Sequence, residues 1–176
     1  MRELIAERGY DNISLADVAA GAGVGRTAVY NHFPDKESVL LAWAQDETES
    51  YLTRLKAELD GEGDPIDRLR IFLRMQMREL ARHHSRLAGI GTALSAEGRQ
   101  QMRAHVAPML ALLAEMLTDA VEAGAVVEQD VPTSVSMISA VTAGRFTLGL
   151  SDEDLERTIQ AATAFVLHGL GASRGQ

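Results

Sequence analysis

Residues 14–36 read SLADVAAGAGVGRTAVYNHFPDK, and this segment gives the clearest indication of the fold. It opens with a capping box, in which the Ser14 hydroxyl and the Asp17 carboxylate each satisfy a backbone N–H at the start of a helix. That helix has about two turns and ends in a glycine-rich segment at residues 21–23. A second short helix at residues 26–32 stops before Pro34, because the residue preceding a proline is pushed out of helical geometry. We therefore expect two short helices joined by a tight turn.

Two short helices that cross steeply need a small residue where they touch and a glycine in the turn. They also need apolar residues that hold the second helix down. Ala19 supplies the small contact, Gly23 the turn, and Val24 and Val29 the inward-facing anchors. The miniature core is completed by Val18 and Ile13. This pattern is typical of a helix-turn-helix, which places a recognition helix in the major groove of DNA.

Three segments together resemble the DNA-binding domain of the TetR family of transcriptional repressors: residues 5–10 (IAERGY), 14–19 (SLADVA) and 23–36 (GVGRTAVYNHFPDK). The resemblance covers about the first 45 residues, over which order, spacing and residue types agree. A helical corner that binds nothing is the alternative, and Tyr30, Phe33-Pro34 and Lys36 disfavour it. The family usually has about ten more residues before this point, with a basic arm. We therefore expect that the chain is truncated at its N-terminus or that its start was assigned late.

The resemblance implies a DNA interface on the helix at residues 26–32. Arg26, Thr27 and Asn31 would face base edges in the major groove. Arg26 can contact guanine in a bidentate manner, and Asn31 can address adenine or a phosphate. Gly25 and Ala28 would allow the DNA to approach closely.

Phosphates would be held by Tyr30, His32 and Lys36, while Ser14 caps its helix near the DNA backbone. The net charge of the chain is −8 with an isoelectric point near 5.1, which by itself argues mildly against nucleic acid. The local distribution is more favourable, since residues 18–34 include no acidic residue. Residues 1–36 hold four basic and five acidic residues, a sum of −1, so the motif carries the hypothesis rather than the charge.

The remaining sequence predicts an all-α protein, because glycine-bounded segments rich in Ala and Leu recur without the alternation that strands need. We expect about nine helices. An N-terminal helix-turn-helix domain of three helices would occupy residues 1–45, and a larger ligand-binding and dimerisation domain residues 46–176. Pro108 should kink its helix or make it start later. Outside residues 14–36, the helices are expected at 2–8, 36–59, 65–87, 95–123, 132–149 and 152–169.

The resemblance also implies a ligand cavity and a dimer in the C-terminal domain. Residues expected to line the cavity are Met77, His84, His105, Met109, Met137 and Val141. As an alternative, the methionines are flexible filler of an apolar core. The last two helices resemble the family's dimer-forming pair, and their Ala, Gly and Ser residues permit close helix approach. These helices could instead only close the core of the monomer.

Five arginines recur every four residues: Arg70, Arg74, Arg78, Arg82 and Arg86. A second surface for DNA or another anion is one interpretation. Four-residue steps advance 400° around a helix, so the row spirals over a broad face, and a solvated face is favoured. His83-His84 and His105 do not predict a metal site, because adjacent histidines diverge by about 100° and no acid cluster joins them.

Composition restricts the alternatives. The chain has 176 residues, of which 46% are hydrophobic and 24% charged, an ordinary balance for a globular protein. Zero cysteines exclude disulfides, thiolate catalysis and thiolate metal sites, and the cytoplasm is the expected location. No uninterrupted apolar run approaches the roughly 20 residues of a membrane-spanning helix, so no membrane partner is expected.

These observations predict a homodimeric, ligand-responsive transcriptional regulator, most simply a repressor that binds a near-palindromic operator in double-stranded DNA. A small-molecule effector would release it, and no cofactor is expected. An enzyme working in the helical C-terminal domain is a rival, but no nucleophile–base–acid constellation supports it. A sensor module that has lost DNA binding is a third hypothesis.

Overall fold

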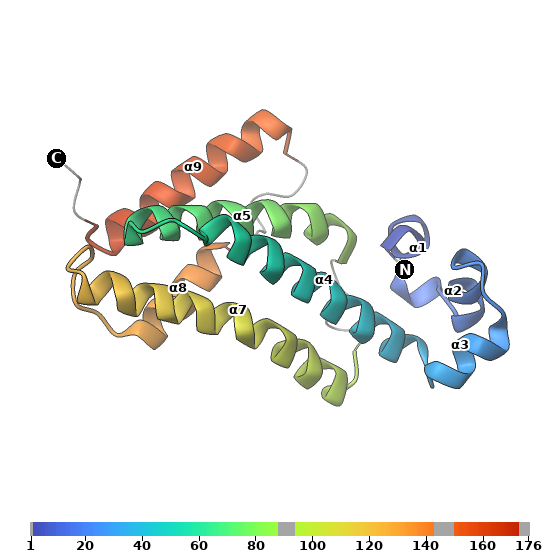
Figure 1. Cartoon of the computed structure of the whole chain (residues 1–176). Coiled ribbons are helices and arrows are strands. Elements are labelled where there is room, and N and C mark those ends of the chain that lie inside the picture. The colour runs from blue at the N-terminus through green and yellow to red at the C-terminus, as the bar shows by residue number, and fades with distance from the viewer. Residues whose placement is uncertain (1, 88–93, 143–149, 173–176) are drawn as a thin grey trace. The chain divides into compact units, whose positions relative to one another are not determined.

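The computed structural model describes residues 2–87, 94–142 and 150–172 (Figure 1). Within these ranges it has eight α-helices, one 3-10 helix and no strand, which confirms the all-α fold class. The elements in chain order are α1 (Arg2–Arg8), η1 (Tyr10–Asn12), α2 (Leu15–Gly21), α3 (Arg26–His32), α4 (Lys36–Leu59), α5 (Pro65–Leu87), α7 (Ala96–Glu122), α8 (Val131–Thr142) and α9 (Asp152–Gly169).

The chain divides into two compact units. Unit 1 combines Met1–Tyr51 with Arg86–Ala107, and unit 2 combines Leu52–Ser85 with Pro108–Gln176. Helices α4 and α7 each begin in unit 1 and continue along the chain into unit 2. The functional division into residues 1–45 and 46–176 stays a prediction.

Local signals determine where most helices begin and end. Gly9, which follows α1, has φ +73°. Glycine adopts this left-handed conformation at little energetic cost, because it has no Cβ. Asp64 caps α5, since its Oδ1 accepts hydrogen bonds from the backbone N–H groups of Ile66 (2.8 Å) and Asp67 (2.9 Å). Ser151 caps α9 through a hydrogen bond from Asp154 N (3.1 Å). The predicted end of α8 at residue 149 lies outside the described residues.

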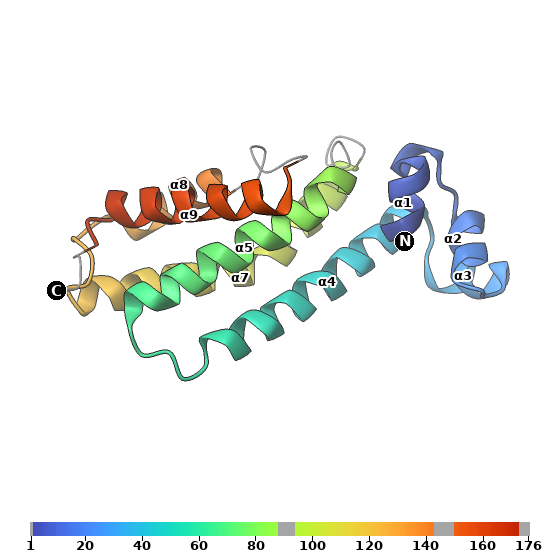
Figure 2. The same cartoon turned by 90° about the horizontal axis from the view of Figure 1, so that it is seen from above.

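Unit 2 packs α5 against the ends of α4 and α7 and against α9 (Figures 1 and 2). Its fully buried side chains include Leu55 from α4, Leu69, Leu73 and Met77 from α5, Leu113 and Leu117 from α7, and Ile159 from α9. Met77, which was expected to line a ligand cavity, is 0% exposed within this core, and its role in ligand binding stays a prediction. The alternative of an apolar core is confirmed for this methionine.

Helix α7 departs from two expectations. It begins at Ala96 and runs through Pro108 as one helix, so the alternative that the proline makes it start later is wrong. By length and composition it is also the one helix in the described part that could cross a membrane. Several of its apolar side chains, Leu113, Met116, Leu117 and Ala120, are buried within unit 2. One helix of this kind is weak evidence for a membrane span.

We predict that Met77→Ala lowers the free energy of unfolding by about 2–5 kcal/mol, because it leaves a cavity in a closed core. The measurement is urea-induced unfolding followed by circular dichroism. Met75→Ala is the matched control, since Met75 lies on the same helix and is only partly buried, and it should cost about 1 kcal/mol. A smaller loss for Met77→Ala than for Met75→Ala would contradict the core assignment.

Candidate nucleic-acid interface

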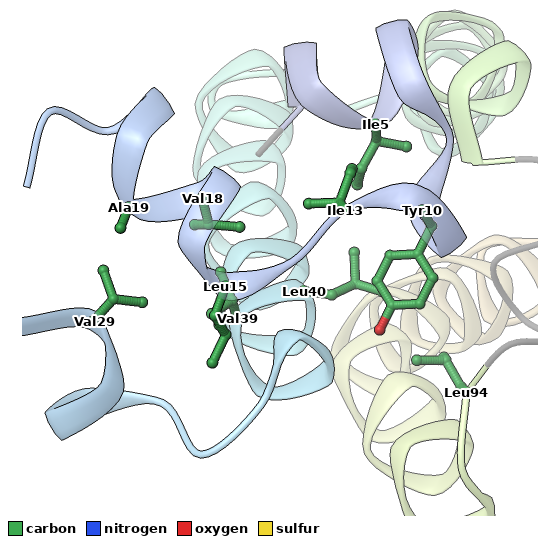
Figure 3. Packing of buried hydrophobic residues seen from close by; sticks show 10 residues of the cluster. All are labelled: Ile5, Tyr10, Ile13, Leu15, Val18, Ala19, Val29, Val39, Leu40 and Leu94. Atoms are coloured by element: carbon green, nitrogen blue, oxygen red, sulfur yellow. The ribbon is translucent and has the colours of Figure 1, made fainter. Parts of the chain in front are cut away.

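One cluster of buried side chains holds the helix-turn-helix region of unit 1 together (Figure 3). Ala19 of α2 and Val29 of α3 face each other across the contact between these helices, with 1% and 8% of their surface exposed. Val18 and Ile13 are buried in the same cluster, as predicted. Val29 is the single buried residue of α3, so the other six residues of the helix face solvent.

The start of α2 is a complete capping box, as predicted. Asp17 N donates to Ser14 Oγ (3.2 Å), and Ser14 N donates to Asp17 Oδ2 (2.9 Å). Arg8 of α1 adds an ion pair with Asp17 at 3.0 Å. The hydrogen bond from the Ser14 hydroxyl, followed by that from Ser14 N and by the charge of Arg8, holds the pKa of Asp17 below its ordinary value. Asp17 is therefore engaged at the beginning of α2.

The turn between α2 and α3 is stabilised by its backbone. Gly23 has φ +66°, as the turn requires, and Val24 N donates to Ala19 O (3.1 Å). The prediction that Val24 is an inward-facing anchor is wrong, because its side chain is 47% exposed. The small contact at Ala19 and the single anchor at Val29 already close the helix pair, and no buried position is left for Val24.

The exposed face of α3 presents the residues proposed for DNA. Its exposed members are Arg26, Thr27, Ala28, Tyr30, Asn31 and His32. Tyr30 is 53% exposed, so its ring and hydroxyl are available to a partner. Gly25 precedes the helix with φ −66°, and a Cβ built there would meet nothing within 4 Å. The protein itself therefore does not require glycine at position 25.

Lys36 lies at the start of α4 and is engaged inside unit 1. Its Nζ donates to the backbone oxygens of Tyr10 (3.0 Å) and Asp11 (3.1 Å), and it lies 4.6 Å from the centre of the Tyr10 ring. Burial of Tyr10, and then the nearby charges of Glu37, Asp35 and Asp11, raise the pKa of the tyrosine. The ammonium thus ties α4 to η1, and its expected phosphate contact stays a prediction.

Two interactions at the start of α4 were missed from the sequence. Asp35 and Ser38 form a reciprocal cap, since Ser38 N donates to Asp35 Oδ1 (2.7 Å) and Asp35 N to Ser38 Oγ (3.4 Å). The three-residue spacing of an N-cap acid and a serine was a signal that could have revealed it. Glu37 accepts hydrogen bonds from Ser95 N (3.0 Å) and Ser95 Oγ (2.5 Å). No local pattern links these two residues, which lie 58 positions apart.

The residues expected to line a ligand cavity are dispersed. His105 lies in unit 1, partly buried, and its Nδ1 has no partner among the described residues. Met109 and Val141 are partly buried residues of unit 2, and Met137 is 65% exposed on α8. The His84 side chain lies outside the described residues. The structure does not bring this set together in one described cavity, and its role in ligand binding stays a prediction.

The arginine row of α5 is not one uniform solvated face. Arg70 pairs with Asp67 (2.5 Å) and Arg82 with Glu79 (3.3 Å) on the same helix. Arg78 instead reaches α9, where its Nε and Nη2 donate to both oxygens of Glu156 at 2.8 and 2.7 Å. These hydrogen bonds hold the pKa of Glu156 below its ordinary value. The Arg86 side chain lies outside the described residues.

Comparison with known proteins agrees with the position of the helix-turn-helix. Residues 2–43 match the family model described as bacterial regulatory proteins, tetR family. The fatty acid metabolism regulator protein of Bacillus subtilis is 24% identical over 131 residues, which cover 72% of this chain and 66% of that protein. The transcriptional regulator AcuR of Cereibacter sphaeroides is 34% identical over 83 residues, 46% of this chain and 37% of that protein. This chain therefore spans less than two thirds of either curated relative.

A solved structure extends the likeness over nearly the whole chain. The transcriptional regulator FadR from Bacillus subtilis, in complex with stearoyl-CoA, has a TM-score of 0.76 and 24% identity. The alignment covers 98% of this chain and 95% of that chain. At this identity the comparison establishes a shared fold.

We predict that Asp17→Asn destabilises the protein at pH 7 and that the difference from the unsubstituted protein disappears on acidification. A folded-state pKa below the ordinary value near 3.8 stabilises the fold above that value and loses its effect as the pH falls through the lowered pKa. The measurement is the free energy of unfolding between pH 7 and pH 3.

Asp119→Asn is the control, because Asp119 is exposed and its carboxylate accepts no hydrogen bond from the described part of the chain. A difference for Asp17→Asn that grows toward low pH would show that the capping box does not act through its carboxylate.

Proposed function

This chain belongs to the TetR family of bacterial regulatory proteins, and we propose that it is a ligand-responsive transcriptional repressor. It binds a near-palindromic operator as a homodimer in the cytoplasm, and a small molecule releases it. The family consists of DNA-binding regulators and not of enzymes, so the enzymatic alternative is dropped. The observation that carries the proposal is α3, which is anchored by Val29 alone and exposes its other six residues.

The exposed face of α3 has the chemistry that base recognition needs. The Arg26 guanidinium can donate two hydrogen bonds to guanine, and the Asn31 amide can both donate to and accept from adenine. Thr27 adds a hydroxyl and a methyl group. Gly25 has no side chain and Ala28 only a methyl group, so DNA can approach the backbone closely at the start of α3. Contacts of this kind specify sequence.

Contacts to phosphates position the helix in the groove. Tyr30 and His32 are exposed on α3, and Ser14 lies exposed at the start of α2. The Lys36 ammonium has three donors, two of which bind the backbone oxygens of Tyr10 and Asp11. Only its third N–H donor remains available for a phosphate. Of the residues proposed to bind phosphate, Lys36 is therefore the one most engaged within the protein.

A homodimer through α8 and α9 is supported by apolar side chains exposed on both helices. Met137 of α8 is 65% exposed and Phe165 of α9 is 69% exposed. A shallow hollow beside Met137 is bordered by Pro132, Ser136 and Ala140. Large apolar side chains and small residues on one pair of helices suit close packing against a second copy. Two-fold symmetry then places two recognition helices about 34–36 Å apart along the operator.

The effector is proposed to act by binding one state of the dimer more tightly than the other. A ligand shifts an equilibrium only through such a difference in affinity. The structure of the Bacillus subtilis relative contains stearoyl-CoA, so fatty acyl thioesters of coenzyme A are the first class to test for release of DNA.

Arg26→Ala should relax the preference for particular base pairs and cost about 1–3 kcal/mol of specific binding, because it removes a bidentate contact to a base. Tyr30→Ala should weaken binding to all sequences alike, because it removes a contact to phosphate. The measurement is fluorescence anisotropy with DNA from upstream of the protein's own gene and with scrambled DNA, at two salt concentrations.

Arg157→Ala is the control, since Arg157 is an exposed arginine of unit 2 that pairs with Asp154. Equal losses of Arg26→Ala on operator and scrambled DNA would refute a role in base recognition. If the unsubstituted protein prefers no DNA after genome-wide selection, the sensor module without DNA binding becomes the better hypothesis.

Gly25→Ala should leave stability within about 0.5 kcal/mol and still weaken DNA binding. The backbone at Gly25 suits any residue and its Cβ would meet nothing, so only an approaching partner could oppose the methyl group. Thermal unfolding and anisotropy titration measure the two effects. Gly63→Ala is the control, because the space at Gly63 is also open. Unchanged DNA affinity of Gly25→Ala would argue against close approach at this point.

A further inference from the structure

A cavity of about 570 Å³ lies in unit 2 between α5 and α9, which run side by side in both views (Figures 1 and 2). Arg70 and Arg74 border it from α5, and Ile159, Thr163 and Leu167 border it from α9. Its volume falls within the range of small-molecule sites in proteins. None of the residues that the family resemblance implied for the effector cavity is among the described residues that line it.

The groove combines an apolar floor with a cationic rim. Ile159 and Leu167 are 1% and 7% exposed and form its floor, whereas Arg70 and Arg74 are exposed at its edge. Neither Asp nor Glu is among the described residues that line it. Such a lining suits a molecule with an apolar body and an anionic head.

The charges around the groove leave one cation in excess. Arg70 is neutralised by Asp67 at 2.5 Å. Arg78 and Arg74 share a single carboxylate, because Glu156 receives both hydrogen bonds from Arg78 and is reached by Arg74 through electrostatics alone. Arg74 donates no hydrogen bond to any described residue, so its planar guanidinium is available to a carboxylate or phosphate.

A second polar group without a hydrogen-bond partner lies in the wall of the groove. The Thr163 hydroxyl oxygen is buried and has no hydrogen-bond partner among the described residues. Buried polar groups are nearly always paired, so an unpaired hydroxyl at the wall of a cavity points to a bound partner. Thr163 and Leu167 each lie two residues from Phe165, so their side chains project from the opposite side of α9.

We propose that the α5–α9 groove binds a small amphiphilic anion, with its carboxylate or phosphate on Arg74 and its apolar body on Ile159 and Leu167. Thr163 supplies a further hydrogen bond. The proposal goes beyond the repressor function and does not depend on it, because binding is measured without DNA.

The test is isothermal titration calorimetry of the full chain at low salt with octanoate, octyl phosphate, octanol and inorganic phosphate, each kept below its aggregation concentration. Octanoate or octyl phosphate, or both, should bind, and the tighter of the two identifies the head group. Octanol and inorganic phosphate should bind at least about tenfold more weakly, because each lacks one half of the interaction.

Arg74→Gln should weaken binding of the anion about tenfold, and Thr163→Val should weaken it less. Arg82→Gln is the matched control, since Arg82 lies on the same helix, is 67% exposed and pairs with Glu79. Circular dichroism of each variant shows that it is folded. Equal binding of octanol, equal losses for Arg82→Gln and Arg74→Gln, or no binding of either octyl anion would overturn the proposal.

Discussion

The carboxylate of Glu37 joins two segments of unit 1 that are 58 residues apart in the sequence. It accepts hydrogen bonds from the backbone and hydroxyl of Ser95, and the same hydroxyl accepts a bond from Gly98 N at 2.9 Å. A Cβ built at position 98 would overlap Glu37 Oε1, so the Glu37 side chain would have to shift to admit one. Since Glu37 lies in the first turn of α4 and Ser95 precedes α7, the starts of both helices are held together.

The helix-turn-helix is consequently not supported by the first 45 residues alone. Leu94, next to Ser95, is buried in the same cluster as Ile5, Tyr10 and Leu40 (Figure 3). The ammonium of Lys36 reinforces this cluster by binding the backbone of η1 and lying near the Tyr10 ring. The unit that carries the recognition helix therefore includes a segment that reaches it from far along the chain.

The chain is acidic, yet the exposed face of α3 carries no acidic residue. The nearest aspartates are engaged in hydrogen bonds with backbone N–H groups. Asp17 and Asp35, which flank the region from Val18 to Pro34, accept hydrogen bonds from N–H groups at helix starts. In the same way, the arginines of α5 are divided among partners on their own helix and on α9. Total charge is thus a poor guide to this surface, and the position of each charged group decides its role.

The helices and the helix-turn-helix could be predicted from the sequence, because they depend on interactions between neighbouring residues. The capping box at Ser14, the left-handed Gly9 and the proline after α3 act within a few residues of chain, so their effects can be recognised without a structure.

Which candidate side chains are free to bind depends on how distant segments pack together. Val24 is exposed because Ala19 and Val29 already close the turn, and Met77 is buried because α5 is covered on that side. Lys36, Glu37 and Arg74 likewise depend on partners from distant segments. Helix signals are local, whereas burial and charge pairing are set by whichever remote segment packs against a residue, and sequence spacing alone does not contain that information.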